Sequence, residues 1–170
     1  MLVVVSDTHA RTHHELAGRT LDAVREADVV VHAGDFNREP VLDAFYDVSS
    51  TFYGVYGNTD DDAIRDRLPA ARTFAYEGVR FAVTHTRNGG PTALSLFGRE
   101  RDADVVLFGH SHRPTLDTDG EVTLLNPGSY NQPRGNRPAH AELTPVAGGL
   151  RCRLMTPDGD CFAETTVAPE

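Results

Sequence analysis

Residues 105–112 read Val-Val-Leu-Phe-Gly-His-Ser-His, an apolar run that ends in two histidines. Four earlier runs of β-branched or apolar residues also end in a short polar tail that carries Asp, Asn or His. The five runs with their tails are 2–5 before Ser6-Asp7-Thr8-His9, 29–31 before Gly34-Asp35, 52–56 before Gly57-Asn58-Thr59-Asp60, 79–83 before Thr84-His85, and 105–108 before Gly109-His110-Ser111-His112. Such runs predict buried strands. Because α/β sheets bind ligands in the loops at strand ends, we expect the five tails to converge on one site.

Length and composition predict one soluble domain that spans residues 1–170. A chain of 170 residues with 39% hydrophobic content can form one sizeable core. We do not expect a chain of this length to form two. No uninterrupted apolar segment approaches the ~20 residues that would span a bilayer, so we expect no membrane partner. Met1 leads directly into the first strand without a signal peptide, which predicts a cytoplasmic protein.

The charge balance is acidic. Sixteen basic residues, all of them Arg, stand against 25 acidic residues and give a formal net charge of -9. Non-specific binding of nucleic acid rests on cationic groups that neutralise phosphates. The composition therefore predicts no strong nucleic-acid surface, although Arg134 and Arg137 could line a local one.

The order of the predicted elements changes near residue 73, from alternating strands and helices to hairpins. Helices are predicted over 13–27, from Pro40 onward, from the Asp60–Asp62 cluster to the residue before Pro69, and over 91–101. The first would begin at a capping box formed by Thr12 and Glu15. Glu77-Gly78 and Asp119-Gly120 are typical hairpin turns. With no linker between the halves, we expect an α/β fold of two sheets in one domain with helices outside.

Cys152 and Cys161 fall in a predicted hairpin whose turn is 157–160. That turn would place Thr156 opposite Cys161, and Cys152 opposite Thr165. The two thiols are then not neighbours across the strands, so we expect no disulfide, in agreement with a reducing compartment.

The polar tails together offer enough donors for two metal ions. The seven candidate ligands are Asp7, His9, Asp35, Asn58, His85, His110 and His112. Carboxylate and imidazole together suit Mn, Fe, Zn, Co or Ni, whereas Mg and Ca prefer mostly oxygen. Any one of these residues could instead be a helix cap, a turn residue or a core histidine. Five strand ends that each carry a donor by accident are far less plausible than a metal site.

Two divalent cations, two Asp carboxylates and a bridging hydroxide would leave a centre with a net charge of about +1. Asp35 is the best candidate for a bridging carboxylate because it stands alone in its motif. A pair of ions roughly 3.5 to 4 Å apart can bind phosphoryl oxygens and present hydroxide for in-line attack on phosphorus. The pattern therefore predicts a metal-dependent phosphoesterase.

The remaining histidines fall outside this pattern. We expect His13 and His14 at an exposed helix start, His32 in the core or behind a ligand, and His140 on an ordinary strand surface. Asp60 is either a solvated helix-capping residue or a group that orients a metal ligand.

The ordered series Asp-x-His, Gly-Asp, Gly-Asn-x-Asp, Thr-His, Gly-His-Ser-His and Asn-Pro-Gly-Ser resembles the calcineurin-like metallophosphoesterase superfamily, in particular its small YfcE-type phosphodiesterase branch. The resemblance covers residues 1 to about 145. It implies a four-layer αββα sandwich of two mixed sheets flanked by helices. It also implies two bound metal ions, with Mn as the most typical metal. The first ion would be held by Asp7, His9, Asp35 and His112, and the second by Asp35, Asn58, His85 and His110. Substrates would be small phosphodiesters or nucleotide-like compounds, and homo-oligomers are common in this branch.

Two positions depart from the family pattern. Thr59 stands where larger relatives carry a His that protonates the leaving group, and Arg87 stands where the small branch often carries a second His. Arg cannot usefully donate a proton at neutral pH, but it can clamp phosphate oxygens. We therefore take Arg87 as a candidate catalytic residue that binds substrate phosphate. The alternative is a surface Arg paired with a carboxylate.

Two other functions remain open from the sequence. The same small fold resembles the retromer subunit that serves as a protein-interaction scaffold with little or no hydrolytic activity. A nuclease would use the same centre on nucleic-acid phosphodiesters.

Overall fold

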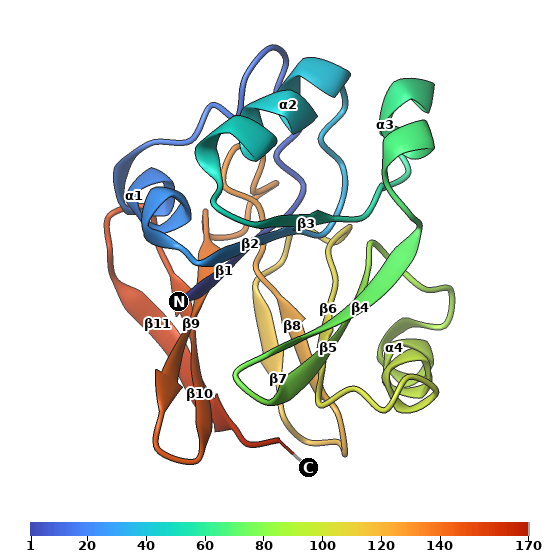
Figure 1. The fold of residues 1–170 in the computed structure, drawn as a ribbon, viewed down its shortest axis with the longest axis vertical. Helices are drawn as coiled ribbons and strands as arrows, with labels where there is room; N and C mark the ends of the chain where they lie inside the picture. The colour runs from blue at the N-terminus through green and yellow to red at the C-terminus, as the bar shows by residue number, and fades with distance from the viewer. Residues whose placement is uncertain (170) are drawn as a thin grey trace.

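Two mixed β-sheets face each other in the computed structural model, which describes residues 1–169 (Figure 1). The first sheet has the order β11-β10-β9-β1-β2-β3 and the second the order β4-β5-β6-β8-β7. The strands of the first sheet are β1 (Leu2–Val5), β2 (Val29–His32), β3 (Phe52–Gly54), β9 (His140–Val146), β10 (Gly149–Met155) and β11 (Cys161–Val167). The strands of the second are β4 (Ala71–Tyr76), β5 (Val79–Thr84), β6 (Val105–Leu107), β7 (Thr115–Asp117) and β8 (Thr123–Asn126).

Helices cover the outer faces of both sheets. They are α1 (Gly18–Glu26), α2 (Glu39–Val48), α3 (Asp62–Arg67) and α4 (Gly90–Arg99). One apolar cluster, which includes Leu2 and Phe81, fills the space between the sheets. A second joins the first sheet to α1, α2 and α3, and a third joins the second sheet to α4. The predicted four-layer αββα sandwich is thus confirmed.

The parallel strands explain why the polar tails meet. In the first sheet β1, β2 and β3 run parallel, with Val5 opposite His32 and His32 opposite Gly54. In the second sheet β5, β6 and β8 run parallel as well. Since each of these strands is followed by a polar tail, the tails of each sheet emerge at one edge.

The first helix is shorter than predicted. Residues 11–17 form a loop, and the helix spans Gly18–Glu26. The expected capping box is wrong, because the Glu15 carboxylate accepts the backbone N–H of Arg11 instead. The turn between β10 and β11 sets the helix start: the N–H of Arg19 donates to the carbonyl of Pro157 at 2.8 Å. A Cβ at position 18 would lie 2.7 Å from the same oxygen.

The hairpin that carries the cysteines differs from the prediction at one end. Cys152 faces Thr165 as expected, but a bulge places Met155 opposite Cys161, where Thr156 was predicted. The bulge arises because the turn is one residue wider, with the Thr156 N–H bonded to the carbonyl of Asp160. Both cysteines are free thiols.

Two histidines predicted on the surface are buried. The Nδ1 atom of His14 accepts the N–H of Leu16 at 3.0 Å, so this ring stabilises the loop before α1. His140 lies beneath α1, where Glu142 and Thr20 bind its two ring nitrogens. Strand alternation alone could not reveal that a helix covers this face. Among the described residues, no helix has the length and apolar character needed to cross a bilayer.

Candidate metal centre

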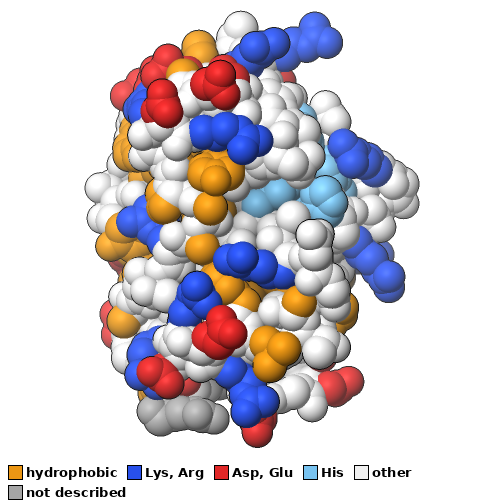
Figure 2. Space-filling view, turned by 90° about the vertical axis from the view of Figure 1, so that its right-hand side faces the viewer, with side chains coloured by type: hydrophobic (Ala, Val, Ile, Leu, Met, Phe, Trp, Pro, Cys, Tyr) orange, Lys and Arg blue, Asp and Glu red, His pale blue; other side chains and the backbone are white. Residues whose placement is uncertain are grey.

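The structure brings all seven predicted ligand side chains together at the edge where the parallel strands end. Figure 2 shows histidine side chains on the floor of a hollow, with basic side chains on several sides of it. Two groups of donors lie close enough to hold an ion, each with ligand atoms within 4.8 Å of one another. The groups are Asp7, His9 and His112, and Asp7, Asp35 and His85.

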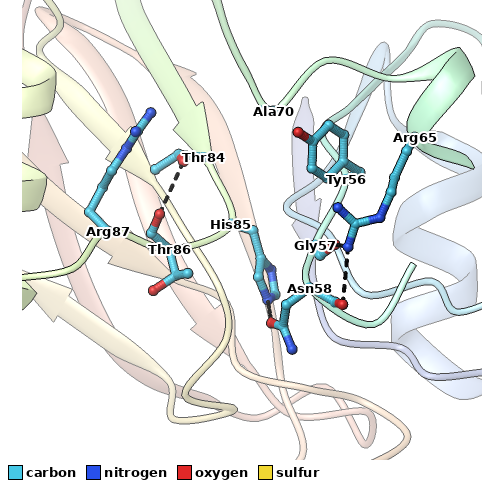
Figure 3. Close-up of a pocket in the computed structure, with 9 residues that line it drawn as sticks. All are labelled: Tyr56, Gly57, Asn58, Arg65, Ala70, Thr84, His85, Thr86 and Arg87. Atoms are coloured by element: carbon cyan, nitrogen blue, oxygen red, sulfur yellow. Dashed lines mark hydrogen bonds between the residues drawn. The ribbon is translucent and has the colours of Figure 1, made fainter. Parts of the chain in front are cut away.

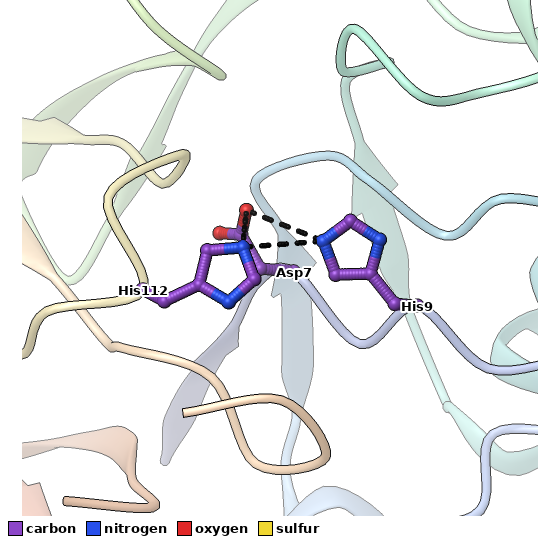
Figure 4. A group of neighbouring side chains, drawn as sticks. All are labelled: Asp7, His9 and His112. Carbon is purple, nitrogen blue, oxygen red and sulfur yellow. Dashed lines mark hydrogen bonds and ion pairs between the residues drawn. The ribbon is translucent and has the colours of Figure 1, made fainter. Parts of the chain in front are cut away.

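The first group combines the loop after β1 with the loop after β6 (Figure 4). The Nε2 atoms of His9 and His112 are 3.2 Å apart. Oδ1 of Asp7 lies 3.3 Å from Nε2 of His112 and 4.0 Å from Nε2 of His9. Oδ2 of Asp35 approaches the same His9 nitrogen to 3.6 Å. These four residues are the predicted first ligand set.

The second group has Asn58 and His110 beside it and includes Asp35. Oδ2 of Asp35 lies 3.3 Å from Nε2 of His85. Oδ1 of Asn58 lies 3.0 Å from that His85 nitrogen and 3.0 Å from Nδ1 of His110. These are the members of the predicted second set, and Asp35 faces both groups.

The donor spacing fits ion coordination. Two ligand atoms ~2.1 Å from one ion lie about 3.0 to 3.4 Å apart at tetrahedral or octahedral angles. In both predicted ligand sets the closest contacts between side chains, at 3.0 to 3.3 Å, fall in this range, and the others, at 3.6 to 4.0 Å, are longer. Several bring a carboxylate oxygen to an imidazole nitrogen, an arrangement that a shared cation stabilises.

Three histidines are oriented by hydrogen bonds on their far side. Nδ1 of His85 bonds the carbonyl of Ala33 at 2.8 Å, and Nδ1 of His112 bonds the carbonyl of Gln132. A carbonyl only accepts, so these two Nδ1 atoms carry the proton. Nδ1 of His9 faces Oδ1 of Asn37 at 2.9 Å in the same way. Their Nε2 atoms are then left as inward-facing ligands, the usual arrangement around a metal.

Burial and neighbouring charges have opposite effects on the pKa values of the candidate ligands. Burial lowers the pKa of His85 and His112, but hydrogen bonds and the charges of Asp35 and Asp7 outweigh burial and raise both pKa values. Burial also acts to raise the pKa of Asp35, yet the contact with His85 leaves that pKa well below its usual range. Asp35 is therefore ionised at neutral pH and available to a cation.

Backbone strain is concentrated on the ligands. Five of them adopt left-handed φ angles between 44° and 70°: Asp7, His9, Asp35, His110 and His112. Such angles are uncommon for residues other than Gly, and they persist where the surroundings dictate them. Here they turn each side chain from the strand direction into the hollow, which the sequence pattern did not reveal.

Two glycines allow the tails to approach one another. A Cβ at Gly57 would lie 2.1 Å from Oδ1 of Asp35, and a Cβ at Gly109 would lie 2.1 Å from Oγ of Ser6. Both distances are far below a non-bonded contact. The Gly-Asn and Gly-His pairs therefore need glycine for close packing against the neighbouring ligand loop.

Asp60 and Arg65 hold the loops that carry the second ligand set. Asp60 is buried and accepts backbone N–H groups of Asp35, Asn37 and Gly57, whereas Asp61 caps α3. The interpretation of Asp60 as a solvated residue is thus wrong, and its bond to Asp35 supports the alternative, still a prediction, that Asp60 orients a metal ligand. Arg65, which the sequence pattern did not indicate, donates to the carbonyl of Asp60. It also donates to the carbonyls of Gly57 and Asn58 (Figure 3). A basic residue on a short helix gave no signal for this role.

The Asn-Pro-Gly-Ser motif supports the other two loops. The side-chain amide of Asn126 donates to the carbonyl of Gly109 and to Oγ of Ser111. Oγ of Ser129 donates to the carbonyl of Asp7 at 2.7 Å. This motif therefore positions the Gly-His-Ser-His and Asp-x-His tails.

The two departures from the family pattern lie beside the ligands. The N–H of Thr59 donates to Oδ1 of Asp35, so Thr59 orients a carboxylate.

Arg87 lines two cavities next to His85 and His110. Its guanidinium carbon lies 4.2 Å from the ring centre of Phe97, and the side chain points away from Asn58 (Figure 3). No described carboxylate pairs with Arg87, and its buried Nε has no hydrogen-bond partner among residues 1–169.

Known proteins resemble this chain in sequence. Residues 1–147 match the family model of the calcineurin-like phosphoesterase superfamily domain. A probable metallophosphoesterase of Methanocaldococcus jannaschii is 31% identical over 139 residues, which cover 79% of this chain and 70% of that protein. The phosphodiesterase YfcE of Escherichia coli is 30% identical over 104 residues, which cover 58% of this chain and 55% of that one.

Solved structures share the fold. The E. coli YfcE phosphoesterase aligns with a TM-score of 0.72 at 22% identity, over 98% of each chain. Vps29 of Chaetomium thermophilum aligns with a TM-score of 0.81 at 14% identity, over 99% of this chain and 98% of that one. Because the family model matches most of the sequence, this chain belongs to the calcineurin-like phosphoesterase superfamily.

Proposed function

We propose that this protein hydrolyses phosphodiesters with two divalent metal ions. The observation that carries the proposal is the position of Asp35: its Oδ2 lies 3.6 Å from Nε2 of His9 and 3.3 Å from Nε2 of His85. One carboxylate oxygen thus faces both donor groups, as a bridging ligand must. Asp7 also faces both groups, but its Oδ1 is close to only one of them, at 3.3 Å from Nε2 of His112 and 4.0 Å from Nε2 of His85.

The residues present fit two transition-metal ions. Two carboxylates, one amide oxygen and four imidazoles form a mixed oxygen and nitrogen set, for which we propose Mn, with Fe, Zn, Co or Ni as substitutes. Bound ions would stabilise negative charge on phosphoryl oxygens and activate water as a nucleophile at neutral pH. On an acidic protein, the hollow would then be a local site for anions.

The chain's own residues orient the ligands and receive the substrate. Oγ of Ser6 donates to Oδ2 of Asp7 at 2.6 Å, and the N–H of His110 donates to the same carboxylate. The third strand-end tail has Thr59 where a proton donor would stand, so we expect solvent to protonate the leaving group. Diesters with good leaving groups are the favoured substrates for that reason.

We retain Arg87 as a proposed substrate contact. Its Nε has no hydrogen-bond partner among residues 1–169, and its place on the wall of both cavities suits contact with an anion. In the conformation described, the group stacks on Phe97, so it would meet the substrate beside the metal centre.

Hydrolysis of bis(p-nitrophenyl) phosphate by Mn-loaded protein tests the proposal. We expect p-nitrophenolate release that requires metal and falls at least about a hundredfold in Asn58→Ala, because loss of one ligand disrupts the second set. Asn88→Ala, an exposed Asn on the loop before α4, is the control. No hydrolysis with any transition metal would instead favour the scaffold function. Cleavage of single-stranded nucleic acid that weakens steeply with salt would favour the nuclease.

A further inference from the structure

A second cavity adjoins the metal centre on the side of the second sheet. Its volume is about 500 Å³, within the range of sites that enclose small organic ligands. His110 lies on its lining, so the cavity opens directly onto the proposed second metal site. Its apolar walls come from α4 and from the segments that flank the Gly-His-Ser-His tail: Pro91, Leu94, Phe108 and Pro114. These walls suit a flat organic group attached to the scissile phosphate.

The charged groups of this cavity are all basic. Arg87 and Arg113 line it, and no Asp or Glu is among the described lining residues. Neither Arg forms an ion pair with a described carboxylate, a state that they share with most of the 16 Arg of this chain. The distinguishing feature is that both cations line one apolar cavity, on a chain with a net charge of -9. They are complementary to an anion.

The start of α4 adds to this positive character. Gly90 and Pro91 both line the cavity and form the first turn of a helix of 10 residues. Gly89 precedes them with a left-handed φ of 109° and offers no side-chain cap. The N–H of Gly90 donates to the carbonyl of Arg87 and Pro91 has no N–H, so the helix contributes only the positive end of its dipole, which favours negative charge nearby. The helix start and the two arginines therefore act in the same direction.

We infer that the cavity binds the organic group of the substrate and that Arg87 and Arg113 recognise a second anionic group on it. The substrate class is a diester of phosphate in which one esterified group is apolar and carries a further phosphate or carboxylate, such as a nucleoside phosphate. This inference rests on the proposed function, because it places the scissile phosphate at the metal centre. It adds that the cavity selects for charge beyond that phosphate.

Two matched ligand pairs test the inference. The first is thymidine 3′,5′-bisphosphate against thymidine 5′-monophosphate, with binding to the Mn-loaded protein measured by calorimetry. The second is thymidine 5′-(p-nitrophenyl phosphate) with and without a 3′-phosphate, compared by kcat/KM. Within each pair only the second phosphate differs. We expect about tenfold or greater preference for the bisphosphorylated member, because a charge-assisted hydrogen bond in a partly buried site contributes that much.

The variant Arg113→Gln keeps an exposed, similarly sized side chain, so the fold is not at risk. We expect it to reduce the preference to less than about threefold in both pairs, whereas Arg151→Gln, on exposed β10 surface, leaves it unchanged. An unchanged preference in Arg113→Gln, or no preference in the native protein, overturns the inference. Ester hydrolysis without any preference overturns only the inference. A preference in binding without hydrolysis of any ester overturns only the proposed function.

Discussion

The Asp60 carboxylate accepts the backbone N–H of Asp35, with 3.0 Å between Oδ2 and the nitrogen. The same oxygen accepts the N–H of Gly57 at 2.7 Å, so one buried group ties the loop after β2 to the loop after β3. Both loops carry proposed metal ligands. Burial raises the pKa of Asp60, against the effect of the three N–H donors. The two loops are thus joined by an acidic group that bonds their backbone N–H groups.

Replacement of Asp60 by Asn tests this dependence. An amide has one oxygen and cannot accept all three N–H groups, so we expect Mn affinity to fall roughly ten- to a hundredfold. Calorimetric titration of the metal-free protein measures the change. Asp66→Asn, at an exposed position of α3, is the matched control. Equal Mn affinity in Asp60→Asn and the native protein would rule out the orienting role.

Arg65 offers an independent test of the same loop. Its side chain donates to three carbonyls and stacks over Tyr56 at 4.9 Å from the ring centre. Arg65→Lys keeps the charge but loses the planar fork. We expect weaker binding of one of the two Mn ions, by about three- to tenfold, since Asn58 loses its support. Arg67→Lys on the same helix should leave both sites intact. Loss of both ions, or of neither, would contradict this account.

Gly57→Ala tests the close approach of two ligand loops. The added Cβ would lie 2.1 Å from Oδ1 of Asp35, so either the carboxylate or the loop must move. We expect lower Mn affinity together with a loss of stability of about 1 to 3 kcal/mol. Chemical denaturation with and without Mn separates the two effects. Gly120→Ala, whose Cβ would meet nothing closer than 3.8 Å, is the control. A stable Gly57→Ala variant with native Mn affinity would show that the loops need no such contact.

Acid stability should depend on a buried cluster away from the metal centre. Burial acts to raise the pKa of Glu142, but His140 and the bidentate Arg19 lower it to about 2 from an ordinary value of 4.5. Because the folded pKa is depressed, this stabilisation is complete above about pH 5 and is lost as pH falls from 4.5 through 2. Its size is on the order of 3 kcal/mol.

The variant Glu142→Gln should therefore be less stable at pH 7 and lose less stability between pH 5 and pH 2.5. Urea denaturation across this range measures both effects, and Glu164→Gln, exposed on β11, is the control. A steep loss of stability that persists unchanged in Glu142→Gln would assign acid sensitivity to other groups.

His14 adds to the loss of stability at higher pH. Burial, His13 and Arg25 lower its pKa to about 4, so protonation destabilises the fold as pH falls from 6.5 through 4.

The sequence predicted the parts of this structure that depend on local pattern. Each apolar run became a strand, and the tails at Asp7, Asp35 and His110 lie together because parallel strands end at a common edge. Contacts between distant segments could not be predicted. The carbonyl of Pro157 delays the start of α1, and α1 in turn covers His140. Neither effect can be predicted from the sequence around the residue that it concerns.

The candidate site also combines features that the local sequence pattern predicts with contacts that it does not predict. Residue types and spacing identified the candidate ligand side chains, since Asp, Asn and His at the ends of strands are suitable donors for divalent cations. They left the role of Asp60 open and did not identify Arg65, because both residues act on backbone groups, which are the same in every sequence. The stacking of Arg87 on Phe97 was equally hidden, since the two residues belong to different elements.

Metal stoichiometry tests the central claim most directly. Mn should be titrated into metal-free protein, with binding and bis(p-nitrophenyl) phosphate hydrolysis followed in the same samples. If Asp35 joins two donor groups, the native protein binds two Mn ions per chain, and activity rises with the second. Asp35→Asn should lose the shared charge and bind at most one ion tightly. A native protein that binds a single ion, or is fully active with one, would contradict the account.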